Sequence, residues 1–171
     1  MTYIRSLAVV AALAAMVFAS TRLTAQDGAA REARDRAAID ALMWRYVRAL
    51  DTRNADAYAA VYTADGQFSA GGTPTKGREA LRKMVADMNT RQAAAAAKGE
   101  AGPAMYHVTT NPYLEFVDQD HARLHAYWMT VFGAAGQATP PRVAAAGHSL
   151  DQLVRVNGQW LIQSRDVAPK D

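Results

Sequence analysis

The stretch VAAAGHSLDQLVRVNGQWLIQSRDV, residues 143–167, decides the fold of this chain. It consists of two β-favouring runs on either side of Asn157-Gly158, and Asn-Gly is a strong signal for a two-residue hairpin. Two further runs of the same character, joined by an Asp-Gln-Asp turn, cover residues 105–117 and 122–132. The second half of the chain therefore predicts a meander of four long strands.

The first half has helical periodicity instead. Apolar residues recur three and four positions apart from Ile39 to Leu50, which predicts an amphipathic helix. Asn54 predicts the N-cap of a short second helix, and a third helix is expected to begin near Gly77. Between these two helices, residues 67–70 predict a short strand. Helices followed by a strand meander are typical of the α+β class, with one antiparallel sheet packed on the helices.

Residues 1–25 have the organisation of a secretory signal peptide. A positive residue precedes the thirteen-residue apolar run Leu7–Ala19, and Ala25 is a plausible cleavage position. The run is shorter than the roughly 18 to 20 residues that span a bilayer, which disfavours a permanent anchor. Residues 26–36 are polar and Ala-rich and predict a flexible lead-in. We expect a secreted or periplasmic protein whose folded domain covers residues 37–168.

The charge and composition of the mature chain narrow the class of partner. Without residues 1–25 the chain keeps 17 basic residues against 16 acidic ones, a net charge of +1. No basic cluster typical of nucleic-acid binding is visible, and no membrane contact is expected after signal removal. The chain has no Cys, so neither a disulfide nor a reactive thiol is expected. An apolar or amphipathic small molecule is the expected partner.

Several motifs resemble the NTF2-like superfamily, specifically its SnoaL-like branch. They match the family's first helix, the start of its third helix, its H-x-x-x-N strand and its last hairpin, here Ala38–Asp51, Lys76–Leu81, His107–Asn111 and Gly147–Arg165. The resemblance implies an NTF2-like cone, in which three N-terminal helices are cupped by one strongly curved antiparallel sheet around a deep pocket. It also implies a homodimer formed through the sheet.

Two titratable residues are candidates for chemistry in such a pocket. Asp51 follows the buried stripe of the first predicted helix at its last turn. His107 is expected to share one strand face with Thr109 and Asn111, an unusually polar face for so apolar a chain. Histidine is the side chain best suited to accept a proton near neutral pH.

The family resemblance assigns roles to these positions. In enzymes of the scytalone-dehydratase and hexachlorocyclohexane-dehydrochlorinase type, a first-helix Asp orients a His that abstracts a proton. Asp51 and His107 match these positions, which implies a cofactor-independent lyase or isomerase that needs no metal. The expected substrate-binding residues are Tyr46, Tyr62, Phe68, Asn111, His125, Tyr127 and His148. Leu50 and Phe68 stand where the dehydratase pattern has tyrosines, so a tyrosine-bound water would need another hydroxyl, that of Tyr46, Tyr62 or Tyr106.

Three alternatives remain open from the sequence. Asp51, His107, His125 and His148 could form a metal site, although no H-x-H or H-x-x-x-H spacing favours it. The same cone could bind a small molecule without catalysis, or its sheet could serve as a protein-interaction module, because one fold hosts many functions.

Overall fold

The computed structural model describes residues 2–100, 102–133 and 140–170, with side chains from Gln26 onward. The chain divides into two units, Met1–Ala38 and Ile39–Asp171, and helix α1 (Thr2–Asp51) contributes to both. In the described residues, no helix is both long and apolar enough to cross a membrane.

Residues 26–36 are helical in the structure, whereas the sequence predicted a flexible lead-in. Alanine is the best helix former, and the Glu32–Arg36 ion pair of 2.8 Å lies along one helix face. The predicted signal peptide, residues 1–25, falls outside the residues whose side chains are described, and it stays a prediction.

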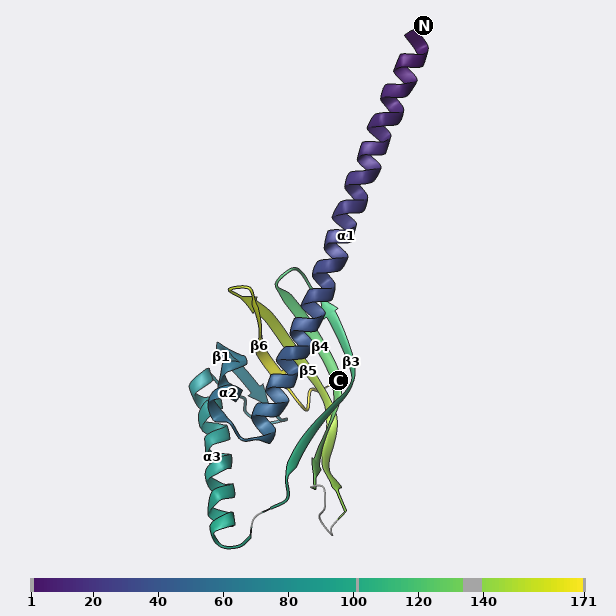
Figure 1. Ribbon diagram of the computed structural model, residues 1–171. Helices are drawn as coiled ribbons and strands as arrows, with labels where there is room; N and C mark the ends of the chain where they lie inside the picture. Colours follow the sequence, from purple (N-terminus) through teal and green to yellow (C-terminus); the bar gives the residue numbers. More distant parts are fainter. Residues whose placement is uncertain (1, 101, 134–139, 171) are drawn as a thin grey trace. The chain divides into compact units, whose positions relative to one another are not determined.

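The second unit contains two further helices and one six-stranded sheet (Figure 1). The helices are α2 (Ala55–Ala60) and α3 (Arg78–Ala97). The strands follow the order β2-β1-β6-β5-β4-β3, and their bounds are Tyr62–Ser69 (β1), Thr75–Lys76 (β2), Met105–Phe116 (β3), His121–Phe132 (β4), Arg142–Val156 (β5) and Gln159–Asp166 (β6). The predicted α+β class is confirmed, and the four long strands begin and end within about one residue of the prediction.

The sheet is mixed, not wholly antiparallel as the sequence predicted. Strands β3 to β6 form an antiparallel meander, but β1 pairs in parallel with β6, for example Phe68 with Arg165. Parallel neighbours need a long connection, and here β2, α3 and strands β3 to β5 lie between the two strands in the sequence. Side chains alternate with a period of two in both parallel and antiparallel strands, so the sequence pattern could not reveal that β1 and β6 are parallel.

The region around α2 differs in detail from the prediction. Asn54 is the N-cap, because its side chain accepts a hydrogen bond of 3.0 Å from the Ala57 backbone N–H. Strand β1 begins at Tyr62, five residues earlier than expected, and its register shifts between Tyr62 and Gln67. Gly66 lies in this irregular stretch, where a Cβ would come 2.9 Å from the Tyr62 Cβ. The Asp65-Gly66 pair thus marks a strand irregularity.

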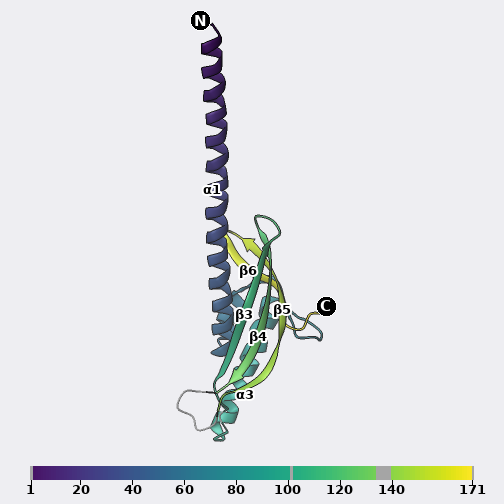
Figure 2. The ribbon, with the colours of Figure 1, turned by 90° about the vertical axis from the view of Figure 1, so that its right-hand side faces the viewer.

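The core of the second unit lies between the helices and one face of the curved sheet (Figure 2). Ile39, Leu42 and Tyr46 provide the buried stripe of α1, and Leu81 and Val85 provide that of α3. The sheet contributes Tyr62, Met105, Ala122, Leu124, Leu153, Trp160 and Ile162. Because the sheet curves and does not close, this packing leaves space near the end of α1.

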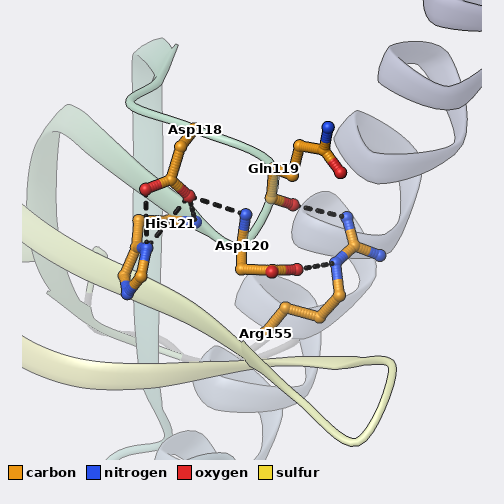
Figure 3. A network of polar contacts seen from close by, with 5 residues as sticks. All are labelled: Asp118, Gln119, Asp120, His121 and Arg155. Atoms are coloured by element: carbon orange, nitrogen blue, oxygen red, sulfur yellow. Dashed lines mark hydrogen bonds and ion pairs between the residues drawn. The ribbon is translucent and has the colours of Figure 1, made fainter.

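A polar network holds the predicted turn between β3 and β4 (Figure 3). Asp118 Oδ1 accepts from the backbone N–H groups of Asp120 and His121, each at 2.8 Å, and lies 2.9 Å from His121 Nδ1. These hydrogen bonds, above all that from Asp120, lower the pKa of Asp118. Arg155 on β5 pairs with Asp120 at 3.2 Å and donates to the Gln119 carbonyl. The network therefore joins the turn to a third strand.

Candidate functional site

A cavity of about 210 Å³ lies between the last turns of α1 and the inner face of the sheet. Its wall is largely apolar, with a few polar groups. The lining residues are Tyr46, Val47, Leu50, Phe68, His107, Thr109, Trp128, Thr130, Ala145, Arg165 and Val167. Helix α1 and strands β1, β3, β4, β5 and β6 contribute to the wall, together with Val167 directly after β6. The site therefore exists only in the folded chain.

Asp51 and His107 are in contact at the edge of this cavity. Asp51 Oδ1 lies 2.7 Å from His107 Nδ1, and the backbone N–H of His107 donates to the same oxygen at 3.0 Å. An ionised carboxylate only accepts hydrogen bonds, so Nδ1 must carry the imidazole proton. The other ring nitrogen, Nε2, is then left with its lone pair on the imidazole that lines the cavity.

The fold explains this contact. Asp51 is the last residue of α1, and its side chain is 6% exposed. His107 lies on the inward-facing side of β3, in phase with buried Met105, and its side chain is 18% exposed. Burial protects the pair from solvent screening, while the cavity keeps one edge of the imidazole accessible.

A second charged pair lies at the cavity wall. Arg165 Nη1 contacts Asp151 Oδ2 at 2.5 Å, and both side chains are almost wholly buried. Burial raises the pKa of Asp151 to about 6, although Arg165 acts to lower it. In the described part of the chain, Arg165 Nε and Asp151 Oδ1 have no hydrogen-bond partner. Of the two residues, only Arg165 lines the cavity, so it presents a positive charge there.

Three tyrosines form a cluster beside this ion pair. The Arg165 guanidinium lies 4.5 Å from the centre of the Tyr46 ring, a cation–π distance. Tyr58 and Tyr62 share a hydroxyl contact of 3.1 Å, and burial raises the pKa of all three phenols. Tyr46 lines the cavity as expected, together with Phe68. Tyr62 belongs to the core and does not line the cavity.

The other expected binding residues lie elsewhere. Asn111, His125, Tyr127 and His148 line a separate hollow, together with Tyr113 and Ala126. The expectation that Asn111 shares a face with His107 was wrong, because the register shifts between Thr110 and Tyr113 and Asn111 has a φ of 51°. Such a bulge reverses the alternation of side chains along the strand.

Strand alternation also explains why the β4 candidates are not in the cavity. Trp128 and Thr130 line it, so the odd-numbered His125 and Tyr127 point to the opposite face of the sheet. Tyr127 is directly opposite His148 on β5, which shares that outer face. The metal alternative finds no support, because the described residues contain no group of three or more His, Cys, Asp or Glu side chains arranged for a metal.

Sequence reasoning did not predict several residues of the cavity wall, among them Trp128, Thr130 and Arg165. Trp128 lines the cavity, and its Nε1 donates to the carbonyls of His148 and Val167 at 3.1 and 3.0 Å. Thr130 was not singled out. Arg165 was noted only as part of a motif. It turns inward because the β5–β6 register shifts between the Gln152 and Leu153 pairs, which no composition signal reveals.

The fold and this cavity define an NTF2-like α+β domain with a pocket between its first helix and its sheet. The chain belongs to the SnoaL-like domain family, whose model matches residues 31–166. A search of curated proteins gave no significant match.

Several solved structures share the fold of this chain. An Rv3472 variant from Mycobacterium tuberculosis, a protein of unknown function, is 26% identical with a TM-score of 0.66, over 81% of this chain and 73% of that one. An NTF2-like protein with a cystatin-like fold from Novosphingobium aromaticivorans is 22% identical with a TM-score of 0.69, over 87% and 90% of the two chains. A putative scytalone dehydratase from the same species is 22% identical with a TM-score of 0.63, over 80% and 84%.

Proposed function

We propose that this protein is a cofactor-independent lyase or isomerase that removes a proton from carbon in a small, largely apolar substrate. The observation that carries the proposal is the 2.7 Å contact between Asp51 Oδ1 and His107 Nδ1 beside a cavity that also contains the Arg165 charge. A base held in one tautomer and a fixed cation on the same cavity wall are the two groups that such a reaction needs.

His107 Nε2 is the proposed base. It takes a proton from a carbon next to a carbonyl or a leaving group, and Asp51 stabilises the imidazolium that forms. In an elimination, the electrons of the broken C–H bond form a double bond while the bond to the leaving group breaks. In an isomerisation, the same proton returns at another carbon. In both cases Arg165 is the group suited to balance negative charge on the substrate oxygen or leaving group.

The size and lining of the cavity limit the substrate. About 210 Å³ is below the usual range of pockets for drug-sized ligands, so the substrate has few non-hydrogen atoms. Val47, Leu50 and Phe68 provide an apolar wall, and the polar groups Thr109 and Thr130 lie on neighbouring strands. A compact carbonyl compound or compact molecule with a leaving group fits this chemistry.

The test begins with a ligand retained in the pocket, identified by native mass spectrometry. In deuterated water, the wild-type protein should exchange one carbon-bound proton of that ligand or release its leaving group. His107→Gln keeps a polar side chain of similar length but removes the base, so turnover should fall by about 10²- to 10⁴-fold. Ligand binding should change by less than about tenfold, because the base acts mainly in the transition state. Unchanged turnover in His107→Gln would exclude the proposed base.

A non-catalytic small-molecule binder is the second candidate. It is favoured by Leu50 and Phe68, which line the cavity where the dehydratase pattern has two tyrosine hydroxyls. An apolar wall at these positions improves binding of an apolar ligand but supplies no group for positioning water. Tight binding without exchange in deuterated water would favour this function.

We also propose that the protein is exported and that it forms a homodimer through the outer face of its sheet. Tyr106, Val108, Tyr113 and Tyr127 are large and exposed there, which is the kind of surface that a partner covers. N-terminal sequencing of exported protein should begin near Gln26. Sedimentation should give twice the monomer mass, and Tyr113→Glu should reduce it to the monomer.

A further inference from the structure

A second hollow, distinct from the enclosed cavity, lies between the end of α1 and α2. It has a volume of about 510 Å³, and we call it the helix groove. Its floor is formed by the buried residues Ala49 and Val61, and its rim by the exposed Trp44, Arg45 and Arg48. The other lining residues are Thr52, Asn54, Ala57 and Ala60. None of these residues lines the enclosed cavity, so the groove is a separate feature with its own chemistry.

The rim of the groove is unusual for a solvated helix face. Trp44 is 66% exposed, although indole is among the side chains that gain most from burial. It lies on the opposite side of α1 from buried Leu42, Met43 and Tyr46, so the core cannot use it. An exposed indole beside an apolar floor is typical of a binding surface, not of a surface selected only for solubility.

The charge of the rim points to an anion. Arg45 and Arg48 are exposed, and within the described residues neither forms an ion pair. Arginine binds carboxylates through two parallel hydrogen bonds, and its guanidinium also stacks on aromatic rings.

We propose that the helix groove binds an amphipathic carboxylate of small-molecule size. The apolar body would lie on the alanine and valine floor against the Trp44 indole, and the carboxylate would accept hydrogen bonds from Arg45 and Arg48. The volume falls within the range of small-molecule sites, whereas a macromolecular partner would require a larger continuous surface. This site is independent of the function proposed for the enclosed cavity.

The experiment uses dodecanoate as the probe, kept below its micelle concentration, with dodecanol and dodecyltrimethylammonium as uncharged and cationic controls. Dodecanoate should bind with one site by calorimetry and shift the tryptophan emission to the blue, because Trp44 is the most exposed indole of the described chain. Both control compounds should bind at least tenfold more weakly: dodecanol can accept only a neutral hydrogen bond and carries no charge to pair with the arginines, and dodecyltrimethylammonium has no acceptor and is repelled by them.

Variants locate the binding. Arg45→Glu with Arg48→Glu should weaken dodecanoate binding more than tenfold, and Trp44→Ala should abolish the emission shift. Arg91→Glu, which changes an exposed cation on α3 outside the groove, is the matched control and should bind as the wild type does. Circular dichroism on each variant should show an unchanged fold.

Four results would overturn the proposal. The first is equal affinity for dodecanoate and dodecanol. The second is unchanged binding in the double arginine variant. The third is loss of binding in Ala145→Leu, which narrows the enclosed cavity, with binding retained in the groove variants. Binding of the protein to anionic phospholipid vesicles without any binding of free dodecanoate would likewise assign the groove to a membrane surface instead.

Discussion

Replacing Asp51 with Asn tests how much the carboxylate charge contributes to the proposed reaction. One oxygen of Asp51 faces both the backbone N–H and Nδ1 of His107, so the amide oxygen of Asn can accept both hydrogen bonds. The tautomer of His107 is therefore kept, and the change removes mainly the negative charge. This separates charge stabilisation from orientation.

The expected magnitude follows from the geometry. With an imidazolium and a carboxylate whose charge centres lie about 4 Å apart, at an effective dielectric constant of about 20, the attraction is roughly 4 kcal/mol. Because the Asp51 side chain is 6% exposed, solvent screens little of it. Loss of about 4 kcal/mol from the transition state corresponds to about a 10³-fold lower kcat.

The assay is exchange of a substrate proton in deuterated water, with ¹⁵N NMR of His107 to show that Nδ1 still carries the proton. Asp40→Asn is the matched control, because Asp40 is an exposed carboxylate on the same helix. Asp51→Ala should be less stable by about 1 to 3 kcal/mol, since the buried backbone N–H then loses its acceptor. A fall of less than tenfold for Asp51→Asn, with the tautomer kept, would refute the role of the charge.

Three further predictions concern stability. Gly147→Ala places a Cβ 3.0 Å from the Trp128 indole and should cost about 1 to 3 kcal/mol in urea unfolding, whereas Gly72→Ala, with nothing within 4 Å, should cost less than about 0.5 kcal/mol. Burial raises the pKa of Asp151 in the folded state to about 6. Protonated Asp151 therefore stabilises the folded state by up to about 3 kcal/mol below about pH 4, and this stabilisation is lost as the pH rises through 6. Asp151→Asn should make the midpoint of thermal unfolding less dependent on pH in this range. Asn54→Ala should cost about 1 kcal/mol, because it removes the N-cap of α2, and an unchanged midpoint would contradict that role.

Local patterns in the sequence were sufficient for the elements themselves. The stripe from Ile39 to Leu50, the Asn54 cap and the Asn157-Gly158 turn depend on neighbours within a few residues, and each is present in the structure. The pairing of Asp51 with His107 was proposed from family motifs. The two groups lie within hydrogen-bond distance, and their catalytic role stays a prediction.

Tertiary structure alone decided which side chains share a cavity. A period of two assigns faces only until a bulge reverses the phase, as it does between Thr110 and Tyr113, and the position of a bulge depends on the partner strand. For this reason Asn111 lies on the outer face of the sheet. A register shift likewise turns Arg165 inward, although a charged side chain would be expected on the solvent face. The parallel pairing of β1 with β6 also depends on tertiary structure, because the packing of distant chain segments determines which strands pair.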